Sequence, residues 1–296
     1  MPAHHDENAG ATAEAFGNIY IVPPAGQHTN TIIFLHGRGS TGREFFEDLG
    51  CSVMSNLRTL PSALTGRGYR LVFPTSRLLY SSVFHEWTPG WLETFFYAGN
   101  ESDRHEAVAR GISDGTQFLH SLMLDEVGRL GGNARKVFLV GISEGGSIGM
   151  WTLFTLPPAL QGLGGFIGLN TSLPFAPSIL RILRGESHGA REGAPMKAEH
   201  RRQDAFVTEK LGTLLSQVRR ERQEPLPRAV QTPVLLTHGA DGKLVDAELG
   251  REAWDTLNAM GFRAAWVEYT GAAEEGHWIK EPEGLDDIFE FITGSR

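Results

Sequence analysis

The sequence has little cysteine and no long apolar run. Its single cysteine, Cys51 among 296 residues, excludes an internal disulfide, which indicates a reducing compartment and a cytoplasmic protein. We expect Cys51 to be a small buried hydrophobic side chain rather than a reactive thiol. No segment approaches the roughly 18 apolar residues of a membrane-spanning helix. The polar stretch 1–16 lacks the pattern of a signal peptide and is interpreted as the disordered start of a mature cytosolic chain.

Basic residues are also in short supply. The chain has 27 Lys and Arg against 35 Asp and Glu, a net charge of −8. This balance argues against nucleic acid or anionic lipid as the main partner, because both attract basic surfaces. No close grouping of His, Cys and Asp has the spacing of metal ligands, and the glycine-rich turns lack the lysine of a phosphate-binding loop. We therefore expect no metal and no cofactor, and the oligomeric state stays open between monomer and homodimer.

Short apolar segments rich in β-branched residues recur along the chain and indicate strands. Most are continuously apolar, as expected for strands covered on both faces. They are residues 18–22, 31–36, 69–74, 136–142, 165–170, 233–238 and 264–269. Apolar residues at helical spacing predict helices over 105–130, 247–260 and 284–292. The alternation predicts a single α/β domain over residues 1–296, with a mostly parallel central sheet and helices on both faces.

Residues 178–230 depart from this alternation. They hold eleven of the 27 basic residues but only seven of the 35 acidic ones, and they show little strand pattern. An amphipathic helix is predicted over 205–222. We interpret the stretch as an insertion between two strands, either a lid over a site or a solvated basic excursion from the surface.

The strongest chemical signal is KVFLVGISEGGSIGMW, residues 136–151. An apolar strand ends in a G-x-S-x-G motif around Ser143, and small residues then lead into a helical pattern. A serine at a sharp strand-to-helix turn is strained, and the glycines are needed because bulk on either side would clash with neighbouring backbone. Such a turn lifts the Ser143 hydroxyl above the sheet, with the amide of Glu144 facing a developing oxyanion. Ser143 is the predicted nucleophile, with a purely structural turn as the alternative.

Two further segments supply candidate partners for Ser143. Residues 31–42, TIIFLHGRGSTG, form a strand that runs into a His-Gly loop, whose glycines would let the amide of Arg38 turn inward as a second oxyanion donor. His36 is interpreted as a hydrogen-bonding residue that organises this loop rather than as a base. The candidate base is His277, in a glycine-containing loop after the last strand pattern.

The segments LHGRGSTGREF, VGISEGGSIG, THGADGKLV and EGHW, in this order, resemble the acyl-protein thioesterase and carboxylesterase branch of the α/β-hydrolases, particularly its longer fungal members. The resemblance covers roughly residues 17–293 apart from the insertion. It implies a metal-free serine hydrolase that cleaves esters or thioesters with an apolar acyl group. By position it implies that Ser143 is the nucleophile, that His277 is the base, and that the amides of Arg38 and Glu144 form the oxyanion hole.

The acid of the expected catalytic triad departs from the family pattern. In the family it usually stands four residues after the histidine of the His-Gly pair, and here that position is Gly242. We predict that Asp241 takes the role, because Gly242 gives the loop freedom for the preceding side chain to swing toward His277. The alternatives are Asp246, Glu274 or no acid at all.

The resemblance also implies a substrate-binding wall. The segment SLPFA at 172–176 echoes a family segment and Trp87 matches a family tryptophan on the acyl-pocket side, so Leu173 and Trp87 are expected to contact the substrate. Residues 80–99 are rich in aromatic side chains, which either line a bulky pocket or belong to ordinary core. Residues 170–172 read Asn, Thr, Ser where the family commonly has Ser, Gly, Trp, which makes that wall smaller and more polar.

Two rival functions stay open on the sequence alone. The altered acid loop and the aromatic segment are compatible with an acyltransferase or cyclase, which would pass the acyl group from Ser143 to another acceptor. The altered acid loop is also compatible with a non-catalytic protein that binds ligands on a hydrolase scaffold. Product analysis with a competing alcohol or amine separates transfer from hydrolysis, and tight binding without turnover would support the non-catalytic reading.

Overall fold

The computed structural model describes most of the chain. The described residues are 15–81, 85–92, 101–186, 197–220 and 227–294. Most of the predicted disordered start, residues 1–14, therefore lies outside the described residues. Phe16, the last residue of that predicted stretch, is packed instead, with its ring stacked on Phe118 at a centroid distance of 4.0 Å.

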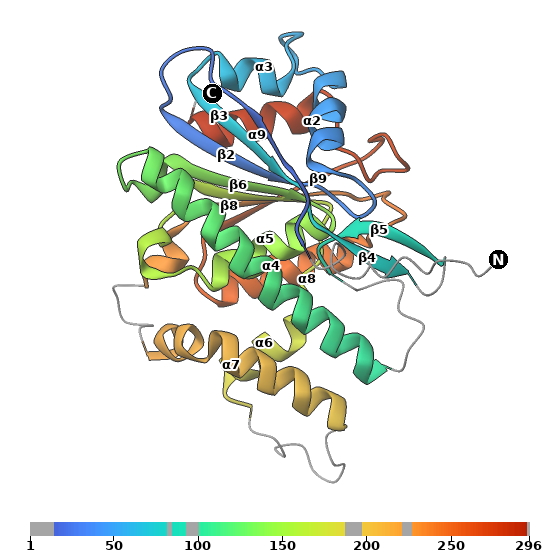
Figure 1. The fold of residues 1–296 in the computed structure, drawn as a ribbon. Helices are drawn as coiled ribbons and strands as arrows, with labels where there is room; N and C mark the ends of the chain where they lie inside the picture. The colour runs from blue at the N-terminus through green and yellow to red at the C-terminus, as the bar shows by residue number, and fades with distance from the viewer. Residues whose placement is uncertain (1–14, 82–84, 93–100, 187–196, 221–226, 295–296) are drawn as a thin grey trace, which may run out of the picture.

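A seven-stranded sheet forms the centre of the molecule (Figure 1). Its strands are β1 (Ile19–Val22), β2 (Asn30–Leu35), β3 (Tyr69–Pro74), β6 (Val137–Ile142), β7 (Gly165–Leu169), β8 (Val234–Gly239) and β9 (Ala264–Tyr269). The spatial order is β1-β3-β2-β6-β7-β8-β9; β1 runs antiparallel to β3 and all other neighbours are parallel. All seven predicted strands are present in the sheet. The continuously apolar runs of β2, β6 and β7 are buried on both faces, as expected for central strands.

Helices cover both faces of the sheet, as predicted. One face carries α2 (Gly42–Cys51), α3 (Leu60–Thr65) and α9 (Glu283–Thr293), and the other carries α4 (Glu101–Arg129), α5 (Glu144–Phe154) and α8 (Ala247–Ala259). Each face has its own hydrophobic core. Three short 3₁₀ helices connect elements: η1 (Ala134–Lys136), η2 (Pro158–Leu160) and η3 (Arg228–Gln231).

The expectation that Cys51 is buried is wrong. The buried positions of α2 are Gly42, Phe45 and Leu49, which lie on one side of the helix at helical spacing. Cys51 comes two residues after Leu49, so it points away from that side and is exposed.

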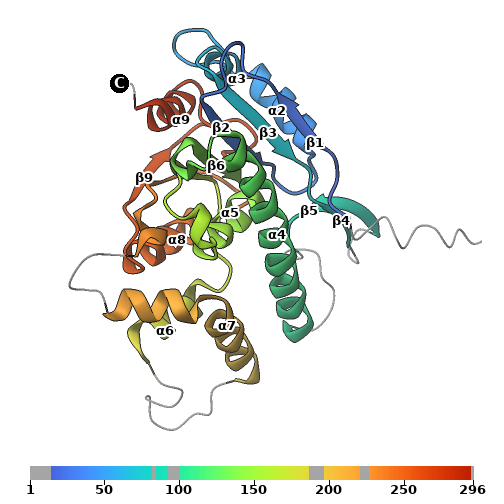
Figure 2. The same ribbon diagram turned by 60° about the vertical axis from the view of Figure 1, so that its left-hand side comes forward.

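The insertion forms an outer layer. Its helices α6 (Ala176–Arg184) and α7 (Ala198–Arg220) pack on each other and lie beyond α4, α5 and α8, as seen in Figure 2. The inward side of α7 carries the buried residues Val207, Leu211, Leu214, Leu215 and Val218, so the amphipathic pattern read over 205–222 is confirmed as far as residue 220. Among the described residues, no helix is both long and apolar enough to cross a bilayer.

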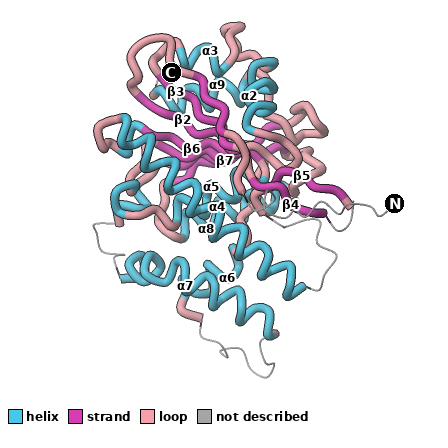
Figure 3. The backbone as a smooth tube through the Cα atoms, viewed as in Figure 1, coloured by secondary structure: helices cyan, strands magenta, loops and turns pink. Residues whose placement is uncertain are grey.

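A two-stranded hairpin stands apart from the main sheet. It pairs β4 (Arg77–Ser81) with β5 (Glu86–Gly90) in antiparallel register, beside the end of the sheet where the parallel strands finish (Figure 3). Part of the aromatic segment 80–99 belongs to this hairpin, while Phe84 and residues 93–100 lie outside the described residues. Trp91 is buried in the core next to the hairpin, as the core interpretation of this segment expects.

Candidate active site

The predicted nucleophile occupies a strained turn. Ser143 lies between β6 and α5 with φ 55° and ψ −124°, a backbone conformation that a residue with a side chain rarely adopts. Its amide donates to the carbonyl of Leu169 on the neighbouring strand β7, at 2.9 Å. The turn is therefore fixed to the sheet while the side chain projects from the strand end.

The two glycines of the motif are required by close backbone contacts. A Cβ on Gly141 would lie 2.2 Å from the carbonyl oxygen of Gly145, and a Cβ on Gly145 would lie 2.2 Å from that of Leu35 on β2. Real Cβ atoms do not come this close to another heavy atom. The steric argument made from the sequence is confirmed, and it ties the nucleophile turn to the adjacent strand β2.

The His-Gly loop after β2 is held from several directions. His36 is buried; its Nδ1–H donates to the carbonyl of Gly37 at 2.6 Å and its Nε2 accepts from the amide of Ser76 at 3.0 Å. Burial lowers the pKa of His36 to about 4, so the ring is neutral at pH 7. The indole N–H of Trp91 donates to the His36 carbonyl at 2.9 Å. Both ring nitrogens of His36 are thus engaged, and the residue organises the loop, as expected.

The two residues expected to supply oxyanion donors lie together. Arg38 and Ser143 both line one cavity, and Glu144 is the first residue of α5, directly after Ser143. The amides of a helix's first turn and the helix dipole favour negative charge at this place. The side chains of Arg38 and Glu144 form an ion pair at 2.8 Å. No sequence pattern predicts this pair, because its residues lie 106 positions apart.

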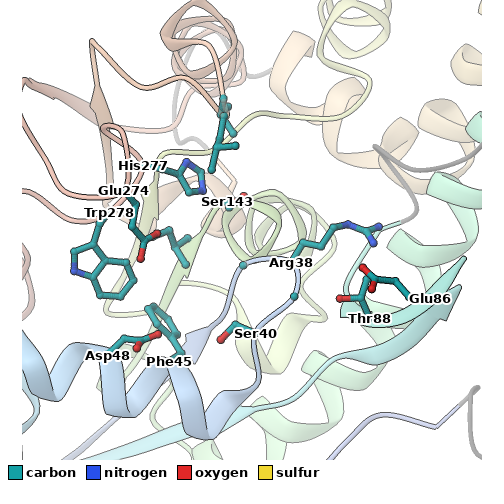
Figure 4. A pocket seen from close by; sticks show the side chains of 15 residues that line it. Arg38, Ser40, Phe45, Asp48, Glu86, Thr88, Ser143, Glu274, His277 and Trp278 are labelled. Atoms are coloured by element: carbon teal, nitrogen blue, oxygen red, sulfur yellow. The ribbon is translucent and has the colours of Figure 1, made fainter. Parts of the chain in front are cut away.

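The candidate base lines the same cavity as the nucleophile. Figure 4 shows the ring of His277 beside Ser143. Burial, followed by the nearby charge of His238, lowers the pKa of His277 below its ordinary value. The imidazole is therefore neutral at pH 7 and able to accept a proton. Among the described residues, none makes a hydrogen bond to the His277 side chain.

Among the described residues, no hydrogen bond joins the Asp241 carboxylate to the His277 ring, so Asp241 as the triad acid stays a prediction. The exposed carboxylate of Asp241 accepts a hydrogen bond from the amide of Gly271 at 2.8 Å. The backbone of Gly242 packs closely against Gly276, the residue before His277. A Cβ added to Gly276 would lie only 2.8 Å from the Cα of Gly242. Gly242 thus leaves the position of the family acid without a side chain.

The two alternative acids occupy different places. Asp246 is the N-cap residue of α8, and its Oδ1 accepts from the amide of Glu248 at 2.9 Å. Glu274 lines the cavity together with His277 and has a positive φ of 52°. Neither makes a hydrogen bond to His277 within the described part of the chain.

Asn170, directly after β7, joins the end of β8 to the loop that carries His277. Its Nδ2 donates to the carbonyl of His277 at 2.8 Å, and its Oδ1 accepts from the amide of Gly239 at 2.7 Å. Its own amide donates to the carbonyl of Thr237. The sequence marked this position only as a polar departure from the family. Its role depends on contacts between segments that are far apart in the chain.

The cavity above Ser143 has a volume of about 680 Å³ and a partly apolar wall. The apolar lining residues are Phe45, Ile142, Leu244, Val245 and Trp278, and the acidic ones are Asp48, Glu86 and Glu274. None of the described residues of the insertion lines it. In its described part the insertion is therefore an outer layer and not a lid over Ser143.

The two expected substrate contacts lie elsewhere. Trp87 is 55% exposed and contacts Tyr80, its partner across the hairpin, at a ring distance of 5.3 Å. Its neighbours Glu86 and Thr88 line the cavity instead, because successive side chains of a strand point to opposite faces. Leu173 is buried in the hydrophobic core and does not line the cavity. The structure thus places neither Trp87 nor Leu173 in the wall of this cavity.

In the described part of the chain, no group of three or more His, Cys, Asp or Glu side chains is arranged to hold a metal ion. The polar groups at the strand ends include a serine, a histidine and the first backbone amides of α5. Their chemistry is that of a nucleophile, a proton acceptor and an anion site.

Comparison with known proteins gives a consistent picture. The family model of phospholipases and carboxylesterases matches residues 17–221. Acyl-protein thioesterase 1 of Gibberella zeae is 25% identical over 274 residues, which are 92% of this chain and 93% of that protein. Among solved structures, SOBER1 of Arabidopsis thaliana superposes with a TM-score of 0.57 at 18% identity, covering 90% of this chain and 99% of SOBER1. Acyl-protein thioesterase 2 of Zea mays gives 0.56 at 18%, covering 94% and 99%. At these identities the two structures show likeness of fold.

Proposed function

This chain belongs to the phospholipase/carboxylesterase family of α/β hydrolases, and we propose that it hydrolyses carboxylic esters or thioesters of an apolar acyl group through an acyl-enzyme on Ser143. The observation that carries the proposal is the strained turn at Ser143, which opens into the same cavity as a neutral His277. If the turn at Ser143 were purely structural, a neutral histidine in the same cavity would serve no purpose.

The proposed reaction uses groups of this chain alone. His277 takes the proton of the Ser143 hydroxyl as the oxygen attacks the acyl carbonyl, and the amides of Arg38 and Glu144 donate to the oxyanion that forms. His277 then gives the proton to the departing alcohol or thiol, which leaves the acyl group on Ser143 as an ester. Water, deprotonated by His277, attacks that ester, and the serine is regenerated with release of the carboxylic acid.

The cavity wall supports an apolar acyl group as the bound portion of the substrate. Phe45, Leu244 and Trp278 would remove acyl carbon atoms from water, which favours binding by about 25 cal/mol per Å² of apolar surface buried. The leaving group is left open by this argument, so small-molecule esters and acylated proteins both belong to the proposal. A cytoplasmic location, supported by the single cysteine, is part of it as well.

The test is labelling with a fluorophosphonate, read by intact mass beside the Ser143→Ala variant. We expect one label per chain on the parent and none on the variant, because only an activated serine reacts. Steady-state hydrolysis of a panel of acyl esters and thioesters, with and without a competing alcohol or amine, would then identify the acyl preference.

Each other outcome has a distinct meaning. A parent that neither reacts with the fluorophosphonate nor hydrolyses any ester would overturn the proposal and favour a non-catalytic binding protein. Product found mainly on the competing alcohol or amine would replace hydrolysis by acyl transfer. Equal labelling of the parent and Ser143→Ala would move the nucleophile to another residue.

A further inference from the structure

The two residues whose amides serve as proposed oxyanion donors also join through their side chains. Arg38 Nε lies 2.8 Å from Glu144 Oε1, and the two side chains are only 13% and 4% exposed. They come from different parts of the chain, 106 residues apart. One belongs to the loop after β2 and the other opens α5 directly after Ser143, so the ion pair links the two sides of the oxyanion site.

Both side chains reach a third segment, which follows the hairpin. Glu144 Oε2 accepts from the amides of Trp91 at 3.1 Å and Leu92 at 3.4 Å, and the Arg38 guanidinium donates to the carbonyl of Leu92 at 2.7 Å. Packing also confines the pair: a Cβ on Gly90 would lie 3.3 Å from Glu144 Oε2 and 3.4 Å from Arg38 Cζ. The pair is therefore held in place by backbone as well as by its own charges.

A role in positioning the oxyanion donors explains this buried ion pair better than a contribution to the free energy of unfolding. Burying two charges costs solvation energy that their attraction roughly returns, so apolar residues of similar size often stabilise a protein as well or better. The oxyanion donors, in contrast, must lie about 2.7–3.1 Å from the oxygen on which charge develops, and displacing such a donor lowers turnover.

We propose that Arg38 and Glu144 are positioning residues, whose side-chain ion pair holds the two oxyanion-donating amides in the geometry of the transition state. The proposal rests on the proposed function, because it needs Ser143 to form a tetrahedral intermediate. It predicts that loss of the pair lowers kcat and the affinity for a tetrahedral adduct, while KM for the ground-state ester changes little.

The experiment compares Glu144→Gln with Glu126→Gln. Glu126 forms a second buried ion pair with Arg70, at 3.1 Å and with side chains 3% and 17% exposed, and neither residue lines the catalytic cavity. For each variant one measures kcat and KM on a short-chain p-nitrophenyl ester, the inhibition constant of phenylboronic acid, and Tm. We expect Glu144→Gln to lower kcat about 10- to 100-fold and to weaken boronate inhibition, with KM within about threefold. Glu126→Gln should lower Tm and leave kcat and boronate inhibition unchanged.

A double variant separates positioning from the effect of an orphaned charge. Arg38→Met with Glu144→Gln removes both charges, so it should recover Tm relative to Glu144→Gln while kcat stays low. The proposal is overturned if Glu144→Gln keeps kcat and boronate inhibition, or if the double variant recovers kcat along with Tm. If the parent itself shows no turnover and no fluorophosphonate labelling, the proposed function fails, and the positioning role fails with it.

Discussion

The serine side and the histidine side of the proposed active site are held in different ways. Ser143 sits in a turn with backbone in contact on both sides, and Arg38 and Glu144 join the surrounding segments through a buried ion pair. His277 lies on a loop that touches its neighbours through backbone, and its ring has no hydrogen bond to any described residue. The carboxylate expected to orient it, Asp241, is bound to the amide of Gly271.

The two sides show two ways in which a protein can fix the position of a catalytic group. Close backbone contacts leave a single geometry for the nucleophile, whatever side chains surround it. The orientation of an imidazole depends instead on one side chain that points at its far nitrogen. The family resemblance implies that this position is Gly242, which has no side chain, and Asn170 holds the histidine loop through the backbone carbonyls of His277 and Trp278. Substitutions can therefore disrupt the backbone contacts on the serine side or add the missing carboxylate on the histidine side.

The largest expected loss follows from Gly145→Ala, which breaks the serine side. The new Cβ would lie 2.2 Å from the carbonyl oxygen of Leu35, so β2 and α5 must move apart. We expect kcat/KM to fall at least about 100-fold, because a shift of 1 Å at a reacting group has an effect of that size. The free energy of unfolding should fall by about 3 kcal/mol or more, measured by urea denaturation.

Gly128→Ala is the matched control for this substitution. Gly128 is an exposed residue of α4 with no atom within 4 Å of the place its Cβ would take. The same change should there stabilise the protein by up to about 1 kcal/mol and leave kcat/KM unchanged. If Gly145→Ala behaves as Gly128→Ala does, the nucleophile turn is not held by backbone contact.

Gly242→Asp should complete the histidine side. The φ of Gly242 lies outside the left-handed region, and a Cβ there would lie 3.0 Å from the carbonyl oxygen of Gly239, so the loop must give by a few tenths of an ångström. A carboxylate at the family position stabilises the imidazolium that forms during catalysis. We expect kcat/KM to rise about tenfold or more. Gly242→Asn has the same size without the charge, and an equal effect of both variants would exclude the electrostatic explanation.

The pH profile tests the state of His277. Its pKa is lowered first by burial and then by the charge of His238, so the neutral, active form persists below the ordinary value of about 6.5. The acid limb of kcat/KM should therefore lie below pH 6.5. In Gly242→Asp the added negative charge favours the imidazolium, so the limb should move to higher pH. A parent limb above pH 6.5 would mean that an anionic partner acts on His277.

The parts of this fold that the sequence predicts are those set by local pattern. Each of the seven strands is a mainly apolar run in the sequence, and the continuously apolar runs of β2, β6 and β7 predict burial on both faces without knowledge of the neighbouring strand. The turn at Ser143 was predictable for a similar reason. The glycine spacing of the motif is itself the steric requirement, and the contacts of Gly141 and Gly145 bear this out.

The features of the site that local sequence pattern does not predict depend on which side a residue faces or on partners far along the chain. Trp87 and Thr88 are neighbours on β5, and only Thr88 lines the cavity, since the phase of the hairpin is set by its packing on the rest of the molecule. The Arg38–Glu144 pair joins residues 106 positions apart, and no periodicity predicts such a contact. Proximity in the sequence predicts Asp241 as the acid, but its carboxylate accepts a hydrogen bond from the amide of Gly271.

The smallest expected effect is that of Asp241→Asn, compared with Asp246→Asn. A true triad acid loses about 10⁴ in turnover on this change, because the histidine then takes the wrong tautomer. The Asp241 carboxylate accepts from the amide of Gly271 and that of Asp246 caps α8, and the Oδ1 of an asparagine serves both purposes. We therefore expect both variants to keep kcat/KM within about threefold. A loss near 10⁴ in Asp241→Asn alone would mean that substrate draws this carboxylate from Gly271 to His277, and the histidine side would then be completed on binding.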